Sequence, residues 1–146
     1  MVIFGASGDL TYRKLIPALY ALYNQKLLPD KFHVLGISRT TIPDGEFREK
    51  MTEGIRKFSE NIHLNDLQIE EFKSHLSYFQ MDMTLEEEYS RLKSALDETN
   101  PNEGADSNYL FYLSTPPSLF SVIAGNLAKV GFSNESDGFK LSLIHI

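Results

Sequence analysis

The chain of 146 residues has the length of one domain, and its composition of 42% hydrophobic and 23% charged residues is that of a globular protein. Its formal net charge of −6 argues against general nucleic-acid binding, which needs a basic surface. The absence of cysteine excludes disulfides and thiolate metal sites, and no apolar run reaches membrane-spanning length, so a cytoplasmic protein that does not bind membranes is expected.

Strand and helix patterns alternate along the chain. Short apolar runs predict strands, and apolar side chains three and four residues apart predict the helices between them. The expected strands are residues 1–4, 32–37, 76–81 and 109–113, with another beginning at 139. The expected helices are residues 9–23, 43–59, 66–72, 84–96 and 118–130. Asn65 or Asp66 is expected to cap the third helix, and Thr84, with Glu87 three residues on, the fourth. This alternation predicts an α/β fold, a Rossmann-like doubly wound parallel sheet that is incomplete at its C-terminal end.

The sequence GASGD at residues 5–9 joins the first strand to the first helix. Glycine permits a tight turn, and the missing side chains let a ligand approach the main chain closely. The start of the following helix offers N–H groups and a positive dipole end to a pyrophosphate, and Arg13 and Lys14 add positive charge one turn later. The spacing is G-x-x-G rather than the G-x-G-x-x-G of dinucleotide-binding proteins. A plain strand-to-helix connection, with Asp9 as a first-turn acid, therefore stays open as an alternative.

The end of the second strand bears on the choice of cofactor. NAD enzymes of this fold place an acid there and NADP enzymes a base, and this chain has Arg39 and no acid before Asp44. A guanidinium can contact the 2′-phosphate of NADP and stack on adenine, and Thr40 adds a hydroxyl. A solvated surface arginine is the alternative, but together with the glycine turn Arg39 favours NADP.

Three blocks of sequence resemble the N-terminal half of the glucose-6-phosphate dehydrogenase family. They are GASGDLTYRKLIPALYALY from residue 5, LGISR from residue 35 and NYLFYLSTPPSLF from residue 108, and the resemblance covers about residues 2–132. It implies NADP-dependent oxidation of glucose 6-phosphate to 6-phosphogluconolactone, the first step of the pentose phosphate pathway, by a longer, homo-oligomeric parent protein. It also implies that the cofactor-binding residues are Gly5, Ala6, Ser7, Gly8, Asp9, Leu10, Lys14, Arg39, Thr40, Asp82, Met83 and Tyr112.

The resemblance also implies what this chain lacks. The family's Glu-Lys-Pro segment and the stretch with its catalytic histidine do not occur, so we expect no catalytic residue here and an inactive fragment. We expect glucose 6-phosphate to bind mostly outside this chain. Residues 1–140 are expected to form a partial NADP-binding domain, and residues 141–146, LSLIHI, a non-native tail similar to the peptide that a sequencing adapter can encode.

Two alternatives to this interpretation stay open. One is a stand-alone, non-catalytic NADP-binding module, which would need a native C-terminus that completes the sheet. The other is a reductase or epimerase of the same fold class, which would need a Tyr-x-x-x-Lys pair. Such a pair occurs at Tyr89 and Lys93, on a helix with a charged surface, and this position argues against it.

Overall fold

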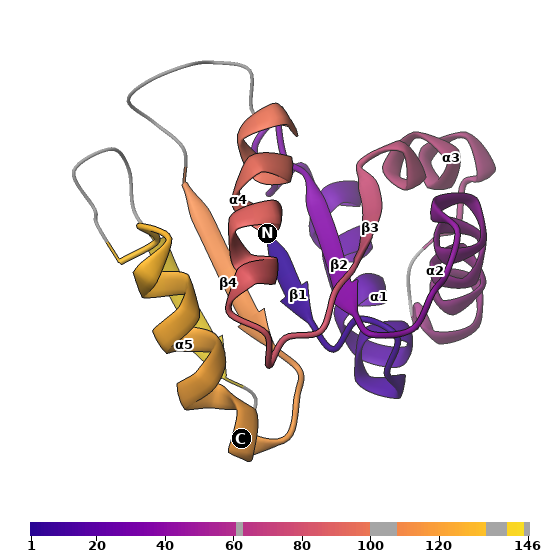
Figure 1. The fold of residues 1–146 in the computed structure, drawn as a ribbon. Coiled ribbons are helices and arrows are strands. Elements are labelled where there is room, and N and C mark those ends of the chain that lie inside the picture. Colours follow the sequence, from indigo (N-terminus) through magenta and orange to yellow (C-terminus); the bar gives the residue numbers. More distant parts are fainter. Residues whose placement is uncertain (61–62, 100–107, 134–139, 145–146) are drawn as a thin grey trace.

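A five-stranded parallel β-sheet forms the centre of the computed structural model, which describes residues 1–60, 63–99, 108–133 and 140–144 (Figure 1). The strands are β1 (Val2–Phe4), β2 (Val34–Ser38), β3 (Leu76–Gln80), β4 (Tyr109–Leu113) and β5 (Lys140–Ile144). Their order across the sheet is β3-β2-β1-β4-β5, and every neighbouring pair is parallel. The predicted parallel sheet is therefore confirmed, and the carboxyl ends of all its strands share one edge.

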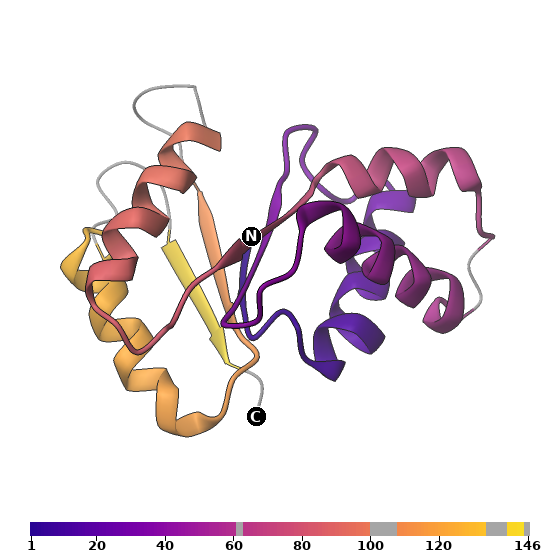
Figure 2. The ribbon, with the colours of Figure 1, turned by 45° about the vertical axis from the view of Figure 1, so that its right-hand side comes forward.

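Helices cover both faces of this sheet. They are η1 (Thr11–Leu15, a π-helix), α1 (Ile16–Asn24), α2 (Asp44–Phe58), α3 (Asp66–Ser74), α4 (Glu87–Thr99), η2 (Pro117–Leu119, a 3-10 helix) and α5 (Phe120–Lys129). One face carries α1, α2 and α3, and the opposite face carries α4 and α5 (Figure 2). This is the doubly wound arrangement that the alternating pattern predicts.

Neighbouring strand residues point to opposite faces, and the sheet therefore separates two cores. Ile3 faces the α1–α3 side, and Val2 and Phe4 face the α4–α5 side. Side chains buried on the first side include Ile16, Tyr20, Phe47, Met51, Ile55, Ile69 and Phe72, and those on the second include Tyr89, Leu92, Phe111, Ile123 and Leu127. Because both faces are covered, β1 is buried throughout, which explains its uninterrupted apolar sequence.

One of the two helix caps expected from the sequence is confirmed, and the other is wrong. The side-chain oxygen of Asn65 accepts hydrogen bonds from the N–H groups of Leu67 (2.9 Å) and Gln68 (3.3 Å), so Asn65 caps α3. Thr84 does not cap α4. Its N–H and hydroxyl both donate to the carboxylate of Asp82, at 2.9 and 2.7 Å, and α4 begins only at Glu87. Thr84 lies three residues before the first helical residue, whereas an N-cap residue directly precedes it, so the Thr84 hydroxyl is not in the capping position.

The last strand lies beside β4. Five residue pairs, from Tyr109 opposite Lys140 to Leu113 opposite Ile144, join the two strands in parallel. Most of the segment 141–146 therefore belongs to this strand. Strand pairing uses main-chain groups that every non-proline residue carries, so the suggested foreign origin of these residues stays a prediction.

Candidate functional site

The order of the strands places a topological switch point between the carboxyl ends of β1 and β4, the position at which dinucleotide-binding sheets form their ligand crevice. The chain continues from β1 to β2 on one side and returns from β3 to β4 on the other, so the strand order reverses at this point. Open parallel sheets bind ligands at such a position. The turn after β1 is held on both sides. The N–H groups of Gly5 and Ala6 donate to the carbonyl of Ile37 at 2.8 and 2.9 Å, and Ser114 N–H donates to the carbonyl of Phe4 at 2.9 Å.

The backbone of the turn needs glycine at its first position. Gly5 has a φ of +86°, and a Cβ there would lie 2.1 Å from the carbonyl oxygen of Ser114. Gly8 closes the turn through a 3.1 Å hydrogen bond from its N–H to the Gly5 carbonyl. Apart from that carbonyl oxygen, a Cβ at Gly8 would meet no atom within 4 Å, so the main chain is open to a ligand there. The turn thus has the close main-chain access that a pyrophosphate requires.

The acid at the start of the helix is paired with a base. The carboxylate of Asp9 lies 3.2 Å from Arg13, one helical turn away, and the Arg13 guanidinium also lies 5.3 Å from the ring centre of Phe58. This pairing offsets the repulsion that Asp9 would exert on a bound pyrophosphate. Ala6 is fully buried, whereas Ser7 and Leu10 are half-buried beside the turn.

A lysine from another helix also reaches the turn. Lys50, on α2, donates from its ammonium group to the carbonyl of Ser7 at 3.4 Å. Sequence reasoning did not single out Lys50. The only available signal was its position beside the buried Phe47 and Met51, which places it at the edge of the helix face that contacts the sheet.

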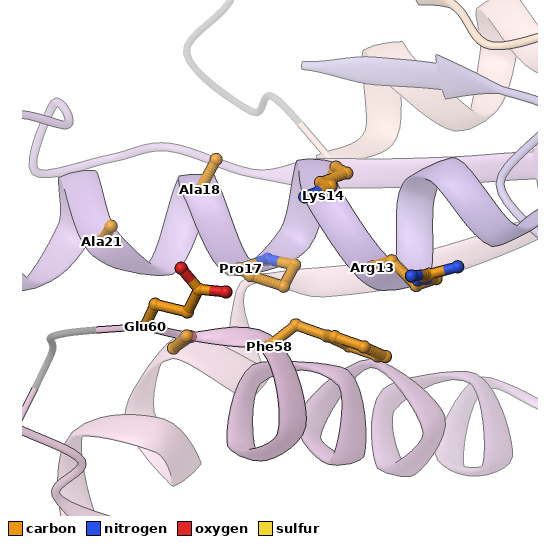
Figure 3. Close-up of a pocket in the computed structure, with 8 residues that line it drawn as sticks. Arg13, Lys14, Pro17, Ala18, Ala21, Phe58 and Glu60 are labelled. Atoms are coloured by element: carbon orange, nitrogen blue, oxygen red, sulfur yellow. The ribbon is translucent and has the colours of Figure 1, made fainter.

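Lys14 lies farther along the same side of the molecule. It is exposed on η1 and lines an open pocket of about 250 Å³ between α1 and the end of α2 (Figure 3). The other residues that line the pocket are Arg13, Pro17, Ala18, Ala21, Phe58, Ser59 and Glu60. Among the predicted cofactor residues, Lys14 is the only one that lines this pocket.

Arg39 and Thr40 are exposed directly after β2, at the same edge of the sheet as the turn. Asp82 follows β3 at this edge. Hydrogen bonds from Thr84, together with the charge of Arg39, hold the pKa of the Asp82 carboxyl below its ordinary value, so Asp82 is ionised at neutral pH. The structure thus brings Arg39, Thr40 and Asp82 to the carboxyl edge beside the glycine turn.

The remaining two predicted cofactor residues lie deeper in the fold. The Met83 side chain is buried in the core on the α4–α5 side, and its carbonyl accepts a 2.7 Å hydrogen bond from the hydroxyl of Tyr89. Tyr112, on β4, is opposite Ile3 of β1 and packs half-buried against the core on the α1–α3 side. A ligand could therefore not meet the Met83 side chain without a change in the core.

The part of the chain that the structure describes holds neither a metal-binding cluster nor a membrane-spanning helix. No group of three or more His, Asp or Glu side chains there is arranged to hold a metal ion. None of the described helices is both long and apolar enough to cross a membrane.

Comparison with known proteins points to one family. A family model described as "Glucose-6-phosphate dehydrogenase, NAD binding domain" matches residues 2–142. The glucose-6-phosphate 1-dehydrogenase of Aggregatibacter actinomycetemcomitans is 44% identical over 144 residues, and that of Treponema pallidum is 35% identical over 144 residues. Each of these alignments covers 99% of this chain and 28% of the relative.

Solved structures that are similar to this chain come from the same family. A structure described as glucose-6-phosphate dehydrogenase in complex with its substrate glucose-6-phosphate superposes with a TM-score of 0.78 at 30% identity. The superposition covers 99% of this chain and 28% of that one. The enzyme of Mycobacterium avium superposes with a TM-score of 0.75, also at 30% identity. The chain therefore spans only 28% of the length of these relatives.

Proposed function

The chain belongs to the glucose-6-phosphate dehydrogenase family and corresponds to its nicotinamide-coenzyme-binding domain, and on this premise we propose that it binds NADP through the glycine turn and Arg39. We propose further that the whole protein oxidises glucose 6-phosphate at C1 to 6-phosphogluconolactone. When bound, NADP supplies the hydride acceptor for this oxidation. The residues of this chain hold and orient the dinucleotide.

The position of Arg39 is the observation that supports binding of NADP rather than NAD. Gly5 and Ala6 both donate to the carbonyl of Ile37, so the phosphate turn lies directly beside the end of β2, where the adenosine ribose meets a dinucleotide-binding sheet. Arg39 is exposed two residues after Ile37, and no carboxylate replaces it on β2. A guanidinium there attracts the 2′-phosphate of NADP and has no equivalent partner in NAD.

The charges around the crevice support a phosphate ligand even though the whole chain is acidic. Lys50 lies at the turn and Arg39 lies at the end of β2. Of the nearby acids, Asp9 is paired with Arg13, and Asp82 accepts two hydrogen bonds from Thr84. A local cluster of cations binds an anion irrespective of a formal net charge of −6 spread over the whole surface.

Proton transfer from the sugar is proposed to use residues outside this chain. His33 and His75 precede β2 and β3, so they lie at the amino edge of the sheet, opposite the crevice. Both already have hydrogen-bond partners: His33 Nε2 lies 2.6 Å from the Ser77 hydroxyl, and His75 Nδ1 lies 2.9 Å from the Phe32 carbonyl. A general base must reach the proton that it removes, and neither histidine is placed to do so.

Calorimetric titration of the chain with NADP and with NAD tests the proposal. We expect wild-type protein to bind NADP more tightly than NAD. A hydrogen bond to a charged group contributes about 1.5–3 kcal/mol, so Arg39→Gln should weaken NADP binding about 10- to 150-fold and leave NAD binding nearly unchanged. Arg56→Gln is the matched control, because Arg56 is exposed on α2 and pairs with Asp66, away from the crevice.

Two results would contradict the proposal. Equal affinity of the wild-type chain for NADP and NAD would contradict the proposed role of Arg39 in recognising the 2′-phosphate. Reduction of NADP by the isolated chain with glucose 6-phosphate, followed by the absorbance of the reduced nicotinamide, would show that the catalytic groups lie within these residues after all.

A further inference from the structure

Strand β3 holds the loop that carries Arg39. Three consecutive main-chain carbonyls of this loop each accept a hydrogen bond from β3 or the residue after it. The Ser38 carbonyl accepts from Met81 N–H (3.0 Å), the Arg39 carbonyl from the Gln80 side-chain amide (3.3 Å) and the Thr40 carbonyl from the Tyr78 hydroxyl (2.5 Å). Residues 38–40 are therefore fixed by a strand about forty residues away in sequence.

The hydroxyl of Tyr78 occupies the centre of this network. It lies 2.6 Å from the Ser38 hydroxyl as well as 2.5 Å from the Thr40 carbonyl. A phenol has one proton and a carbonyl can only accept, so Tyr78 donates to Thr40 and accepts from Ser38. Ser38 Oγ accepts in turn from Thr40 N–H at 3.2 Å. These three hydrogen bonds form a closed cycle that fixes the main chain on both sides of Arg39.

The ring of Tyr78 is itself held in place. Its centre lies 5.0 Å from that of Phe47, and the Tyr78 N–H donates to the carboxylate of Asp44 at 2.8 Å. Both partners belong to α2, so the tyrosine is fixed between this helix and its own strand. Burial raises the pKa of the Tyr78 hydroxyl above its ordinary value of 10.0, so the hydroxyl keeps its proton and the direction of the cycle at neutral pH.

The Arg39 side chain, by contrast, is left available to a ligand. It is exposed, and across the described ranges of the chain no carboxylate lies within 4.0 Å of its guanidinium. Asp82 is near enough for the charge of Arg39 to lower its pKa, but it forms no ion pair with Arg39. A rigid main chain beneath an exposed, unpaired guanidinium favours anion binding, because the loop need not be ordered when the anion binds.

We propose that Tyr78 is a positioning residue that sets the preference for NADP over NAD, by holding the Ser38–Thr40 main chain so that Arg39 and Thr40 face the ribose 2′-phosphate. This inference rests on the proposed function of the chain. Only NADP carries the phosphate that uses this loop, so loss of the Tyr78 hydroxyl weakens NADP binding selectively.

The experiment compares NADP and NAD binding to wild-type chain and to Tyr78→Phe by calorimetric titration at one ionic strength. Loss of one or two neutral hydrogen bonds should weaken NADP binding about fivefold to tenfold and change NAD binding less than about twofold. Ser77→Ala is the matched control. Its hydroxyl pairs with His33 at the amino end of the same strand, so the variant loses a side-chain hydrogen bond and keeps both affinities.

A second variant keeps the test decisive if Tyr78→Phe does not fold, as judged by circular dichroism. Gln80 is exposed, so Gln80→Ala removes the donor to the Arg39 carbonyl with little risk to the core, and it should weaken NADP binding about twofold to threefold. Equal losses for NADP and NAD, or unchanged NADP affinity in the variants, would overturn the role of Tyr78. Failure of the wild-type chain to bind either dinucleotide would instead overturn the proposed function, and the inference with it.

Discussion

Replacement of Gly5 by alanine should strongly destabilise the fold. At a φ of +86° an L-residue is strained by about 1–2 kcal/mol. The new Cβ would also lie 2.1 Å from the carbonyl oxygen and 2.9 Å from the carbonyl carbon of Ser114. These are backbone atoms at the end of β4, so relief requires β1 and β4 to move apart, at a cost of about 1–3 kcal/mol for overpacking. The expected loss in the free energy of unfolding is about 2–5 kcal/mol.

Thermal and urea unfolding followed by circular dichroism measure this loss. For a domain of this size 1 kcal/mol corresponds to about 4 °C, so the Tm should fall by about 8–20 °C. Gly125→Ala is the control with the opposite sign. Gly125 is exposed within α5, and a Cβ there would meet no atom within 4 Å, so alanine should stabilise the protein by about 0.5–1 kcal/mol.

The reasoning about the β1–β4 contact would be refuted if Gly5→Ala unfolded within about 0.5 kcal/mol of wild type, the usual range for a neutral surface substitution. A loss of stability that Gly125→Ala shared would point to a general effect of alanine rather than to the turn. We expect neither result, because Ser114 N–H also donates to Phe4 and so holds the two chain segments together.

Two further predictions concern the Asn65 cap and the half-buried His33. Asn65→Ala removes the acceptor for the N–H groups of Leu67 and Gln68 and should lower the free energy of unfolding by about 1 kcal/mol. Asn65→Asp keeps a side-chain acceptor and should retain most of the wild-type stability. Urea titrations compare the two variants. Burial, followed by nearby positive groups, lowers the pKa of His33 from 6.5, so the unfolded chain binds this proton more tightly than the folded protein does. Stability is therefore unaffected well above pH 6.5 and falls as the pH drops through this value. His33→Gln should flatten that fall, and a histidine NMR titration that placed the pKa of His33 above 6.5 would contradict the reasoning.

The sequence by itself determined the alternation of elements, and it singled out the residues of the proposed cofactor site. Parallel strands covered on both faces need uninterrupted apolar runs, and helices that cover them need apolar residues three and four apart, so both patterns are local and readable. The boundaries of β4 were predicted without error, because an apolar run ends there against polar residues on both sides. Gly5 and Arg39 could also be identified from local sequence, because neighbouring residues mark the turn after the first strand and the end of the second strand.

Only the tertiary structure decided which distant groups meet. The strand order β3-β2-β1-β4-β5 arises from main-chain pairing, which carries no local signature. The hydrogen bonds from Lys50 to the Ser7 carbonyl and from Tyr78 to the Thr40 carbonyl likewise have no local signature, because each joins segments about forty residues apart. The burial of Met83 was likewise hidden, because a methionine has the same local appearance whether it lines a crevice or fills a core. Local propensity and periodicity reach only a few residues along the chain, whereas the surroundings of the proposed phosphate site depend on packing between β2, β3 and α2.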